Sequence, residues 1–290
     1  MRTSLIIPSL NAVTLPATLT AVSKQSHPPD EIIVIGRDET NALAAFPEVR
    51  FIDTQVPVCA AKARNIGMQA ASGDLFLLLD ADCLPRADWL VTHLQKQTLG
   101  EMIVGGSVGL HGSNYWAQSD NVSMFHDFVP QHPPGYRFLL PTLNLSVRRT
   151  VFEQVGGMDE SFPGAAAEDA DWTIRMRMAG FKLFFEPRAT IQHAPARTTW
   201  ADVVRHWRKL GHNAVRVRLR YATEFGTPRL ASNAYWWRWL SPLIAARITA
   251  GIFAKPIFWR CLANLPVVYA TKVIYCLGAA DSVASGFAFR

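Results

Sequence analysis

Two acidic segments in this sequence stand where packing alone does not require acids. In the first, an apolar run from Leu75 to Leu79 ends in Asp80-Ala81-Asp82. Side chains two residues apart in an extended backbone point the same way, so Asp80 and Asp82 could share one divalent cation. A surface turn after a core strand is the competing interpretation, because Asp and Pro are common in turns and Pro85 follows closely.

The second acidic segment is Glu168-Asp169-Ala170-Asp171, which opens a stretch with helical character from Trp172 to Ala179. Carboxylates at the start of a helix also stabilise its dipole. Capping therefore explains this segment as well as chemistry does when the segment is taken alone.

The elements that must position these acids alternate between strand and helix. Strands are expected at Thr3 to Pro8, Glu31 to Gly36 and Val49 to Asp53, and helices at Asn11 to about Val22 and Val58 to Ala71. Such alternation predicts a parallel sheet with right-handed crossovers, in which ligands gather beyond the carboxyl ends of the strands. Asp80 and Asp82 would lie at this edge.

The second half of this region is less regular. Further elements are expected as a helix from Pro85 to about Gln97, strands from Met102 to Val108 and from Pro141 to Val147, a helix from Arg149 to Gln154, and short strands from Lys182 to Glu186 and Ala189 to His193. Between His111 and Tyr136, Gly, Asn, Pro and His are scattered among aromatic residues. We therefore expect an irregular loop region there, which lies over the crevice and shapes an acceptor site.

The composition excludes several classes of protein. With 290 residues, nearly half of them hydrophobic, and with 9 Trp and 16 Phe, the chain can bury a full core and is not disordered. Its 4 cysteines form no CxxC pair, which is typical of a reducing compartment. The apolar part of the N-terminus is too short for a signal peptide, so a cytosolic location is expected.

The charge is divided unevenly along the chain. From Arg197 to the end there are 14 Lys and Arg against 3 Asp and Glu, or +11, which leaves 15 against 20, or −5, for residues 1 to 196. A basic tail beside a mildly acidic module favours binding to anionic lipid or another polyanion. Nucleic acid is the competing partner, but basic residues mixed with Trp and long aliphatic residues are more typical of a membrane surface, so no nucleic acid is expected.

The basic tail from Arg197 onward is predicted to form helices. Thr199 and Asp202 form a capping pair for a basic amphipathic helix, although Val215 to Arg220 alternates strictly enough for a strand. Tyr235 to Trp239 is an aromatic and basic cluster of interfacial type. Because no uninterrupted apolar run approaches about 18 to 20 residues, we expect helices that lie in the membrane interface rather than cross it. An oligomer interface is the remaining alternative.

Several stretches together resemble family 2 glycosyltransferases of the GT-A fold. The resemblance rests on Ile6-Ile7-Pro8 with Asn11, Glu31 to Ile35, Ala63-Arg64-Asn65-Ile66-Gly67, Ala71-Ser72-Gly73-Asp74, Asp80-Ala81-Asp82, Gly156 to Phe162, and Glu168-Asp169-Ala170-Asp171 through Arg175 to Gly180-Phe181. It implies an α/β, Rossmann-like mixed sheet flanked by helices. The resemblance covers about residues 3 to 193. Together with the uneven charge, it predicts a catalytic domain, residues 1–196, and a basic, membrane-associating helical tail, residues 197–290.

The resemblance implies a metal-assisted reaction of a nucleotide sugar. Transfer leaves a diphosphate whose developing negative charge a divalent cation, Mn²⁺ or Mg²⁺, can stabilise. By resemblance to the family's DXD motif, Asp82 is the direct ligand, and Asp80 lies nearer the ribose or a metal-bound water. His193 resembles the family's histidine after the last strand, a further ligand or diphosphate contact, although a core histidine explains it equally well.

The resemblance also assigns the acceptor side of the reaction. Asp169 is the general base for a single displacement that inverts configuration, and Glu168 orients the acceptor or the loop. Arg175 could pair with one of these two carboxylates. The residues expected to bind the nucleotide sugar are Pro8, Asn11, Asp38, Arg64, Asp80 and Ala81.

One segment departs from the family pattern. An Asp-Asp-Gly-Ser type run usually follows the second strand and its first acid reads the base, whereas this chain has Gly36-Arg37-Asp38-Glu39-Thr40. Asp38 could substitute, or Arg64 and the backbone near Pro8 could carry the contact. A UDP-sugar is expected from its prevalence in the family, with guanosine and thymidine nucleotides as alternatives.

The overall expectation is an enzyme of polysaccharide biosynthesis. It would act on a glycan or lipid-linked acceptor, in the cytoplasm and peripheral on the inner face of the cell membrane. Two alternatives are a nucleotidyltransferase and a catalytically inactive sugar-nucleotide-binding or membrane scaffold protein.

Overall fold

A computed structural model of the chain describes residues 1–164, 166–195 and 197–287. The chain divides into two compact units. The first, here called the sheet unit, comprises Met1–Gly109 and Asp127–Ala194, and the second, the helical unit, comprises Leu110–His126 and Pro195–Arg290. The expected domain boundary at Ala196 lies outside the described residues.

The sheet unit is built on one mixed sheet. Its strands are β1 (Thr3–Leu10), β2 (Glu31–Arg37), β3 (Val49–Asp53), β4 (Leu75–Leu79), β5 (Cys83–Pro85), β6 (Ile103–Gly109), β7 (Gly135–Tyr136), β8 (Asn144–Arg148) and β9 (Phe184–His193). Their order is β3-β2-β1-β4-β8-β6-β9-β5, with β7 paired to β9. The four strands β3, β2, β1 and β4 are parallel, as the sequence predicts, and β8 runs antiparallel between β4 and β6.

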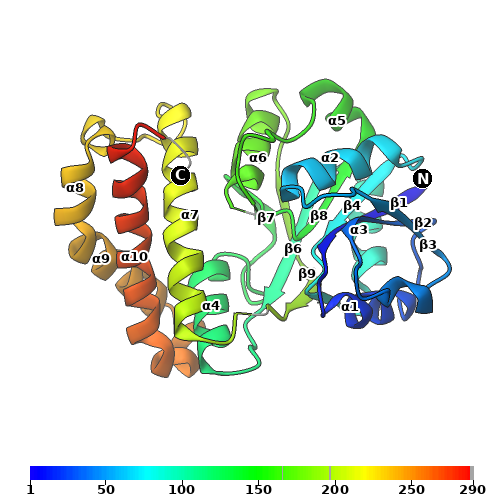
Figure 1. Ribbon diagram of the computed structural model, residues 1–290, viewed down its shortest axis with the longest axis horizontal. Coiled ribbons are helices and arrows are strands. Elements are labelled where there is room, and N and C mark those ends of the chain that lie inside the picture. Colours follow the sequence, from blue (N-terminus) through cyan, green and yellow to red (C-terminus); the bar gives the residue numbers. More distant parts are fainter. Residues whose placement is uncertain (165, 196, 288–290) are drawn as a thin grey trace. The chain divides into compact units, whose positions relative to one another are not determined.

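Helices cover both faces of this sheet (Figure 1). They are α1 (Leu15–Ser23), α2 (Ala60–Ala70), α3 (Trp89–Thr98), α5 (Arg149–Val155) and α6 (Glu168–Met178), with a short 3₁₀ helix η1 (Ala42–Ala45). One face packs Ile6 and Leu78 against Met68 of α2 and Trp172 of α6. Because the central strands are buried on both faces, they read as continuous apolar runs, which is why the sequence identifies them.

A buried polar layer holds the opposite face together. The side-chain oxygen of Asn144 on β8 accepts hydrogen bonds from Trp89 Nε1 at 2.7 Å and from His93 Nε2 at 3.0 Å. Its amide nitrogen donates to the carbonyls of Ser107 and Ala189. Burial lowers the pKa of His93 to about 4, so this ring stays neutral and keeps its place in the layer. The network fixes β6 against β9, the strand that ends in His193.

The expectation of an irregular loop from His111 to Tyr136 is wrong. The helix α4 (Tyr115–Phe125) occupies much of that stretch and belongs to the helical unit. Asn114 caps it by accepting hydrogen bonds from the backbone of the first turn. Its buried side includes polar residues such as Asp120, which accepts from Trp207 Nε1 at 2.7 Å. A polar buried face leaves no hydrophobic period in the sequence, and the helix is therefore invisible to pattern analysis.

The remaining helical unit follows the expectations for the tail more closely. It contains α7 (Trp200–Arg220), η2 (Arg229–Ser232), α8 (Ala234–Trp239), α9 (Ser241–Phe253), η3 (Pro256–Asn264) and α10 (Leu265–Ala284). Thr199 caps α7 by accepting a hydrogen bond from the backbone N–H of Asp202. The alternative of a strand from Val215 to Arg220 is wrong, because α7 continues through it with Trp207, Gly211 and Val215 on its buried side.

Two glycines bring α7 and α10 into close contact. A Cβ atom added at Gly211 would lie 2.0 Å from the carbonyl oxygen of Tyr275, and one added at Gly278 would lie 2.0 Å from that of Arg208. Small residues at such positions let two helix backbones approach each other directly. Lys272 of α10 is buried beside this contact, with Nζ 4.3 Å from the centre of the Trp207 ring.

One helical stretch within the described residues, Pro256–Ala284, is long and apolar enough to cross a membrane by length and composition. Its mean hydropathy is 1.4, and 44% of the apolar window is buried. The core helix of a soluble protein meets the same criteria, so this stretch is weak evidence for a span. That the tail lies on the membrane rather than across it stays a prediction.

The glycine contact gives a test of helix packing in the helical unit. Gly211→Ala should lower the free energy of unfolding by about 1–3 kcal/mol, because the added methyl group forces the helices apart. Gly251→Ala on α9 is the matched control, since a Cβ there meets no atom within 4 Å. That control should stabilise by about 1 kcal/mol through helix propensity. Denaturant unfolding measures the free energy of unfolding of both variants. Equal stabilisation by Gly211→Ala and Gly251→Ala would contradict the close contact of α7 and α10.

Candidate active site

Arg64 of α2 joins the two acidic segments. Its side chain is buried, and its Nη2 lies 2.6 Å from Asp80 Oδ1 while Nη1 lies 2.8 Å from Glu168 Oε1. Asp80 follows β4 directly, and Glu168 is the first residue of α6. Gly67 allows α2 to lie low over the sheet, because a Cβ there would be 2.5 Å from Ile6. The first and second acidic segments therefore meet across one guanidinium group.

The electrostatics of this cluster favour ionised groups. The nearby carboxylates of Asp80 and Glu168 outweigh burial and raise the pKa of Arg64, so the guanidinium stays charged. Two buried atoms of the cluster, Arg64 Nε and Glu168 Oε2, have no hydrogen-bond partner among the described residues. Buried polar groups are rarely left unpaired, and such atoms are expected where a ligand binds.

Asp169 is the second member of the pair at the start of α6. Its Oδ1 accepts a hydrogen bond from the backbone N–H of Ala170 at 2.8 Å. Burial, followed by the charge of Glu168, raises the pKa of Asp169 to about 7, although Arg64 acts in the opposite direction. A carboxylate with a pKa near 7 can take up a proton at neutral pH. Ala167, just before the pair, has a φ of 71°, a strained conformation for a residue other than glycine.

The loop that precedes α6 is held by two side chains. Asn65 Nδ2 donates to the Met158 carbonyl at 2.9 Å, and Asn65 Oδ1 accepts from the Met158 N–H at 2.8 Å. Arg175 donates to Asp171 Oδ2 at 2.9 Å and to the Gly157 carbonyl at 2.6 Å. The expected pairing of Arg175 with Glu168 or Asp169 is therefore wrong. Arg64 reaches Glu168 from a different helix, and Arg175 fastens the preceding loop to α6.

Asp82 and His193 face each other at the same sheet edge. His193 Nε2 lies 3.4 Å from Asp82 Oδ2, and the Ala194 N–H donates to the Asp82 carbonyl at 2.8 Å. The antiparallel pairing of β5 with β9 places Cys83 opposite His193 and so brings the two residues together.

Asp80 does not complete a three-residue metal site with this pair. In the parts of the chain that the structure describes, no group of three or more His, Cys, Asp or Glu could hold a metal. One carboxylate and one imidazole nevertheless fit Mn²⁺ or Mg²⁺, which bind to few protein ligands and take phosphate oxygens and water for the rest.

The residues expected to bind the nucleotide lie at the ends of β1 and β2. Pro8 pairs with Ile35, and Asn11 accepts the Glu39 N–H at 2.8 Å through its side chain. Asp38 accepts hydrogen bonds from the N–H groups of Ala42 and Leu43 at 2.9 Å each, so its carboxylate caps η1.

Two further positions complete this edge. Ala81 is buried, and its carbonyl accepts a hydrogen bond from Thr18. The hydroxyl of Ser9 is buried and has no hydrogen-bond partner within the described ranges. The structure thus brings Asp80, Arg64, Glu168 and Asp169 together, and keeps Asp38 occupied with its own loop.

Two features of this region are not among those predicted from the sequence. Arg37 pairs with Asp53 of β3 at 3.2 Å and with Glu39 at 3.2 Å, and so organises the departing loop. The sequence contains a sign of this role, because Arg37 stands where the family pattern has an acid. The bridging role of Arg64 was also missed, although a single arginine in an Ala-rich helix beside two acidic segments was a usable sign.

The chain is similar in sequence to known proteins. The family model described as "Glycosyltransferase like family 2" matches residues 2–211. "Glycosyltransferase AglE" of Haloferax volcanii is 29% identical over 196 residues, which are 63% of this chain and 63% of that protein. "UDP-Glc:alpha-D-GlcNAc-diphosphoundecaprenol beta-1,3-glucosyltransferase WfgD" of Escherichia coli is 27% identical over 174 residues, 57% of this chain and 66% of that protein. The matched part thus spans less than two thirds of these relatives.

The fold is also found in solved structures. The mannosyltransferase PcManGT from Pyrobaculum calidifontis, solved with GDP-Man and Mn²⁺, has a TM-score of 0.61 at 18% identity. The likeness covers 99% of this chain and 86% of that one. It confirms the α/β sheet of GT-A type that the sequence resemblance implies.

The bridge through Arg64 generates a stability test. Arg64→Leu leaves Asp80 and Glu168 without their cation and should lower the free energy of unfolding by about 3–5 kcal/mol. Arg86→Leu is the matched control, because Arg86 forms an exposed ion pair with Asp88 at 3.5 Å. That loss should cost about 0–1 kcal/mol. Denaturant unfolding measures both, and a similar small cost for the two variants would contradict the bridge.

Proposed function

The chain belongs to the glycosyltransferase family 2-like proteins, and we propose that it transfers a sugar from a nucleotide-diphosphate donor to an acceptor hydroxyl with inversion. The observation that carries this proposal is the Arg64 bridge, which brings Asp80 and the Glu168-Asp169 pair into one site. A transferase needs a donor side and an acceptor side within bonding distance of one sugar carbon. The two acidic segments supply these two sides.

On the donor side, Asp82 and His193 would hold Mn²⁺ or Mg²⁺. When bound, such a cation supplies Lewis-acid stabilisation of the diphosphate leaving group. The Mn²⁺ in the Pyrobaculum calidifontis neighbour supports a divalent cation. Asp80, held at Oδ1 by Arg64, keeps its other oxygen for the ribose or for a metal-bound water.

On the acceptor side, Asp169 is the general base. It takes the proton of the acceptor hydroxyl as the oxygen attacks the anomeric carbon and the bond to phosphate breaks. One base suffices for this single displacement, which inverts the configuration. Glu168 is fixed by Arg64 and orients the acceptor through Oε2, which has no hydrogen-bond partner among the residues that the structure describes.

The nucleotide would lie across the ends of β1 and β2. The carboxylate of Asp38 is taken up by η1, so we assign the base contact to the backbone at Pro8 and Asn11 and to the Ser9 hydroxyl. A UDP-sugar remains the expected donor. The E. coli relative is named as a UDP-Glc enzyme, and the Pyrobaculum calidifontis neighbour was solved with GDP-Man, so both UDP and GDP are to be tested.

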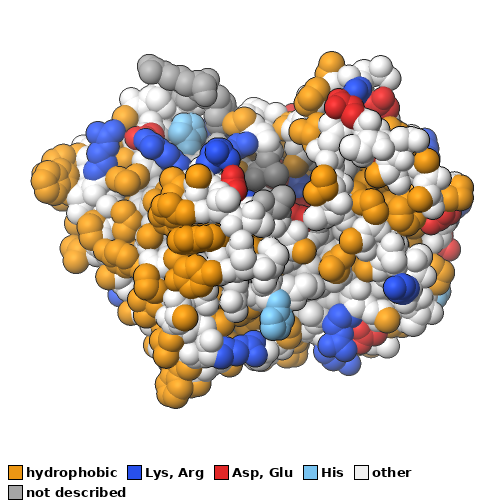
Figure 2. Space-filling model, turned by 60° about the horizontal axis from the view of Figure 1, so that its bottom comes forward, with side chains coloured by type: hydrophobic (Ala, Val, Ile, Leu, Met, Phe, Trp, Pro, Cys, Tyr) orange, Lys and Arg blue, Asp and Glu red, His pale blue; other side chains and the backbone are white. Residues whose placement is uncertain are grey.

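The acceptor is proposed to be lipid-linked or a growing polysaccharide. The E. coli relative is named for a diphosphoundecaprenol-linked acceptor. Large apolar side chains are exposed on the helical unit, among them Trp239 and Leu243 at 68% each, and Figure 2 shows hydrophobic side chains with Lys and Arg among them over this unit. Such a surface, together with the net charge of +11 over residues 197–290, fits the anionic inner face of the cell membrane.

The base assignment predicts the pH dependence of the reaction. A carboxylate accepts a proton only when ionised, so turnover should rise with pH and level off above about 7, the raised pKa of Asp169. Asp169→Asn should lower kcat by about 10²–10⁴-fold and remove this pH step, with donor binding kept. Glu153→Gln, an exposed acid on α5, is the control. Unchanged turnover in Asp169→Asn would overturn the assignment.

The donor site predicts a cation-dependent ligand effect. UDP, GDP and dTDP are added to the protein with and without Mn²⁺, and the melting temperature is measured. One nucleotide should stabilise the protein more strongly with Mn²⁺, and Asp82→Ala should abolish the added Mn²⁺ effect. Asp88→Ala, an exposed acid, should retain it. A full Mn²⁺ effect in Asp82→Ala would exclude Asp82 as a ligand.

A further inference from the structure

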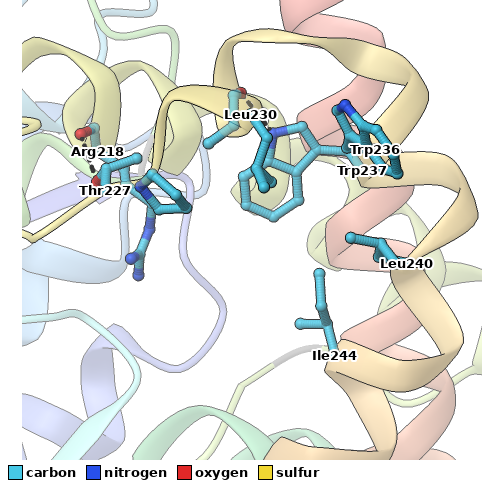
Figure 3. A pocket seen from close by; sticks show the side chains of 9 residues that line it. Arg218, Thr227, Leu230, Trp236, Trp237, Leu240 and Ile244 are labelled. Carbon is cyan, nitrogen blue, oxygen red and sulfur yellow. Dashed lines mark hydrogen bonds between the residues drawn. The ribbon is translucent and has the colours of Figure 1, made fainter.

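The helical unit contains a cavity of about 110 Å³ that the glycosyl transfer does not use (Figure 3). It is lined by Arg218, Thr227, Pro228, Leu230, Ala231, Trp236, Trp237, Leu240 and Ile244. Most of this wall is hydrocarbon. The volume approaches that of an engineered 150 Å³ cavity that stays dry and binds benzene.

The indole of Trp237 and the hydroxyl of Thr227 in the wall already have partners. The guanidinium of Arg218 and the indole of Trp236 are the other polar side-chain groups among the described lining residues. Trp237 Nε1 donates to the Ala231 carbonyl at 2.8 Å, and Thr227 Oγ1 donates to the Arg218 carbonyl at 3.1 Å. A water molecule in the cavity would therefore find few of the two to four polar partners that it needs. The cavity is suited to hydrocarbon instead.

Among the described residues that line the cavity, Arg218 alone is charged. Its guanidinium lies 5.3 Å from the centre of the Phe225 ring and interacts with the hydroxyl of Tyr275, and no carboxylate pairs with it in the described part of the chain. A half-buried arginine without a carboxylate beside an apolar cavity can bind a phosphate group through two parallel N–H bonds.

The rim of the cavity is exposed and apolar. Leu230 and Trp236 are 46% and 41% exposed, and they belong to the same segments as the exposed basic residues Arg229 and Arg238. Aromatic and basic residues side by side are typical of the boundary between lipid headgroups and acyl chains. The rim therefore belongs to the surface that we assign to the membrane.

We propose that this cavity takes part of one acyl chain of an anionic membrane phospholipid, whose phosphate pairs with Arg218. The proposal rests on the membrane contact assigned to the helical unit, and it adds a defined lipid site to that contact. A phospholipid is the assigned occupant because the cavity opens among side chains of the membrane surface.

The test uses the full-length chain and dodecyl phosphate below its micelle concentration, measured by calorimetry. Ile244→Trp fills the cavity and should weaken binding about tenfold or more, whereas Leu243→Trp, its exposed neighbour on α9, should bind like the wild type. Ala231→Leu fills the cavity from η2 and should repeat the loss of binding if Ile244→Trp does not fold.

Arg218→Gln should weaken the binding of dodecyl phosphate about tenfold, because it removes the charge that pairs with the phosphate. Arg205→Gln, exposed on the same helix, should not weaken it.

The remaining measurements separate this proposal from the others. Flotation with phosphatidylglycerol vesicles reports the membrane contact, and donor hydrolysis reports the enzyme activity, which should be unchanged in Ile244→Trp. Equal binding by Ile244→Trp and Leu243→Trp, with the wild type floating and active, would overturn the lipid site alone. Farnesyl phosphate that binds at least about tenfold tighter than dodecyl phosphate would replace the phospholipid with an isoprenyl occupant.

Discussion

The candidate active site depends on one buried charge. Arg64 is only 2% exposed, and burial of a guanidinium is costly unless carboxylates compensate it. Asp80 and Glu168 do so, and in return the end of β4, the middle of α2 and the first turn of α6 are fixed relative to one another. The strained φ of Ala167 beside Glu168 indicates that this arrangement is maintained against local preference. The strain at Ala167 lowers stability locally, while the ion pairs of Arg64 define the positions of β4, α2 and α6.

The sequence predicted the sheet well because burial on two faces leaves an unmistakable pattern. β3 spans Val49–Asp53 as expected, and the parallel order of the first four strands followed from alternation with helices. Pairings between distant segments were harder to predict. Nothing in the spacing of Arg64, Arg175 and the acidic segment says which arginine reaches Glu168, because that depends on how two helices pack. The helix α4 was missed for another reason, since its buried side is polar.

The helical unit is arranged differently from the sheet unit. Its interior contains Asp120 and Lys272, each with partners from other helices, while many of its large apolar side chains face outward. In water this distribution is unfavourable, because exposed apolar surface is not removed from solvent. At a membrane interface the same distribution gives a specific polar core, and the lipid removes the apolar exterior from water. The proposed lipid site is a local form of this arrangement.

The insertion of α4 into the helical unit affects where the chain can be divided. Residues 110–126 leave the sheet unit after β6, join the helical unit, and return before β7, so the two units share three covalent crossings rather than one. A recombination event near Ala196 would deliver a catalytic segment whose α4 retains Asp120 but loses Arg197 and Trp207. Asp120 would then be a buried carboxylate without these two partners, so the helical unit requires both parts of the sequence.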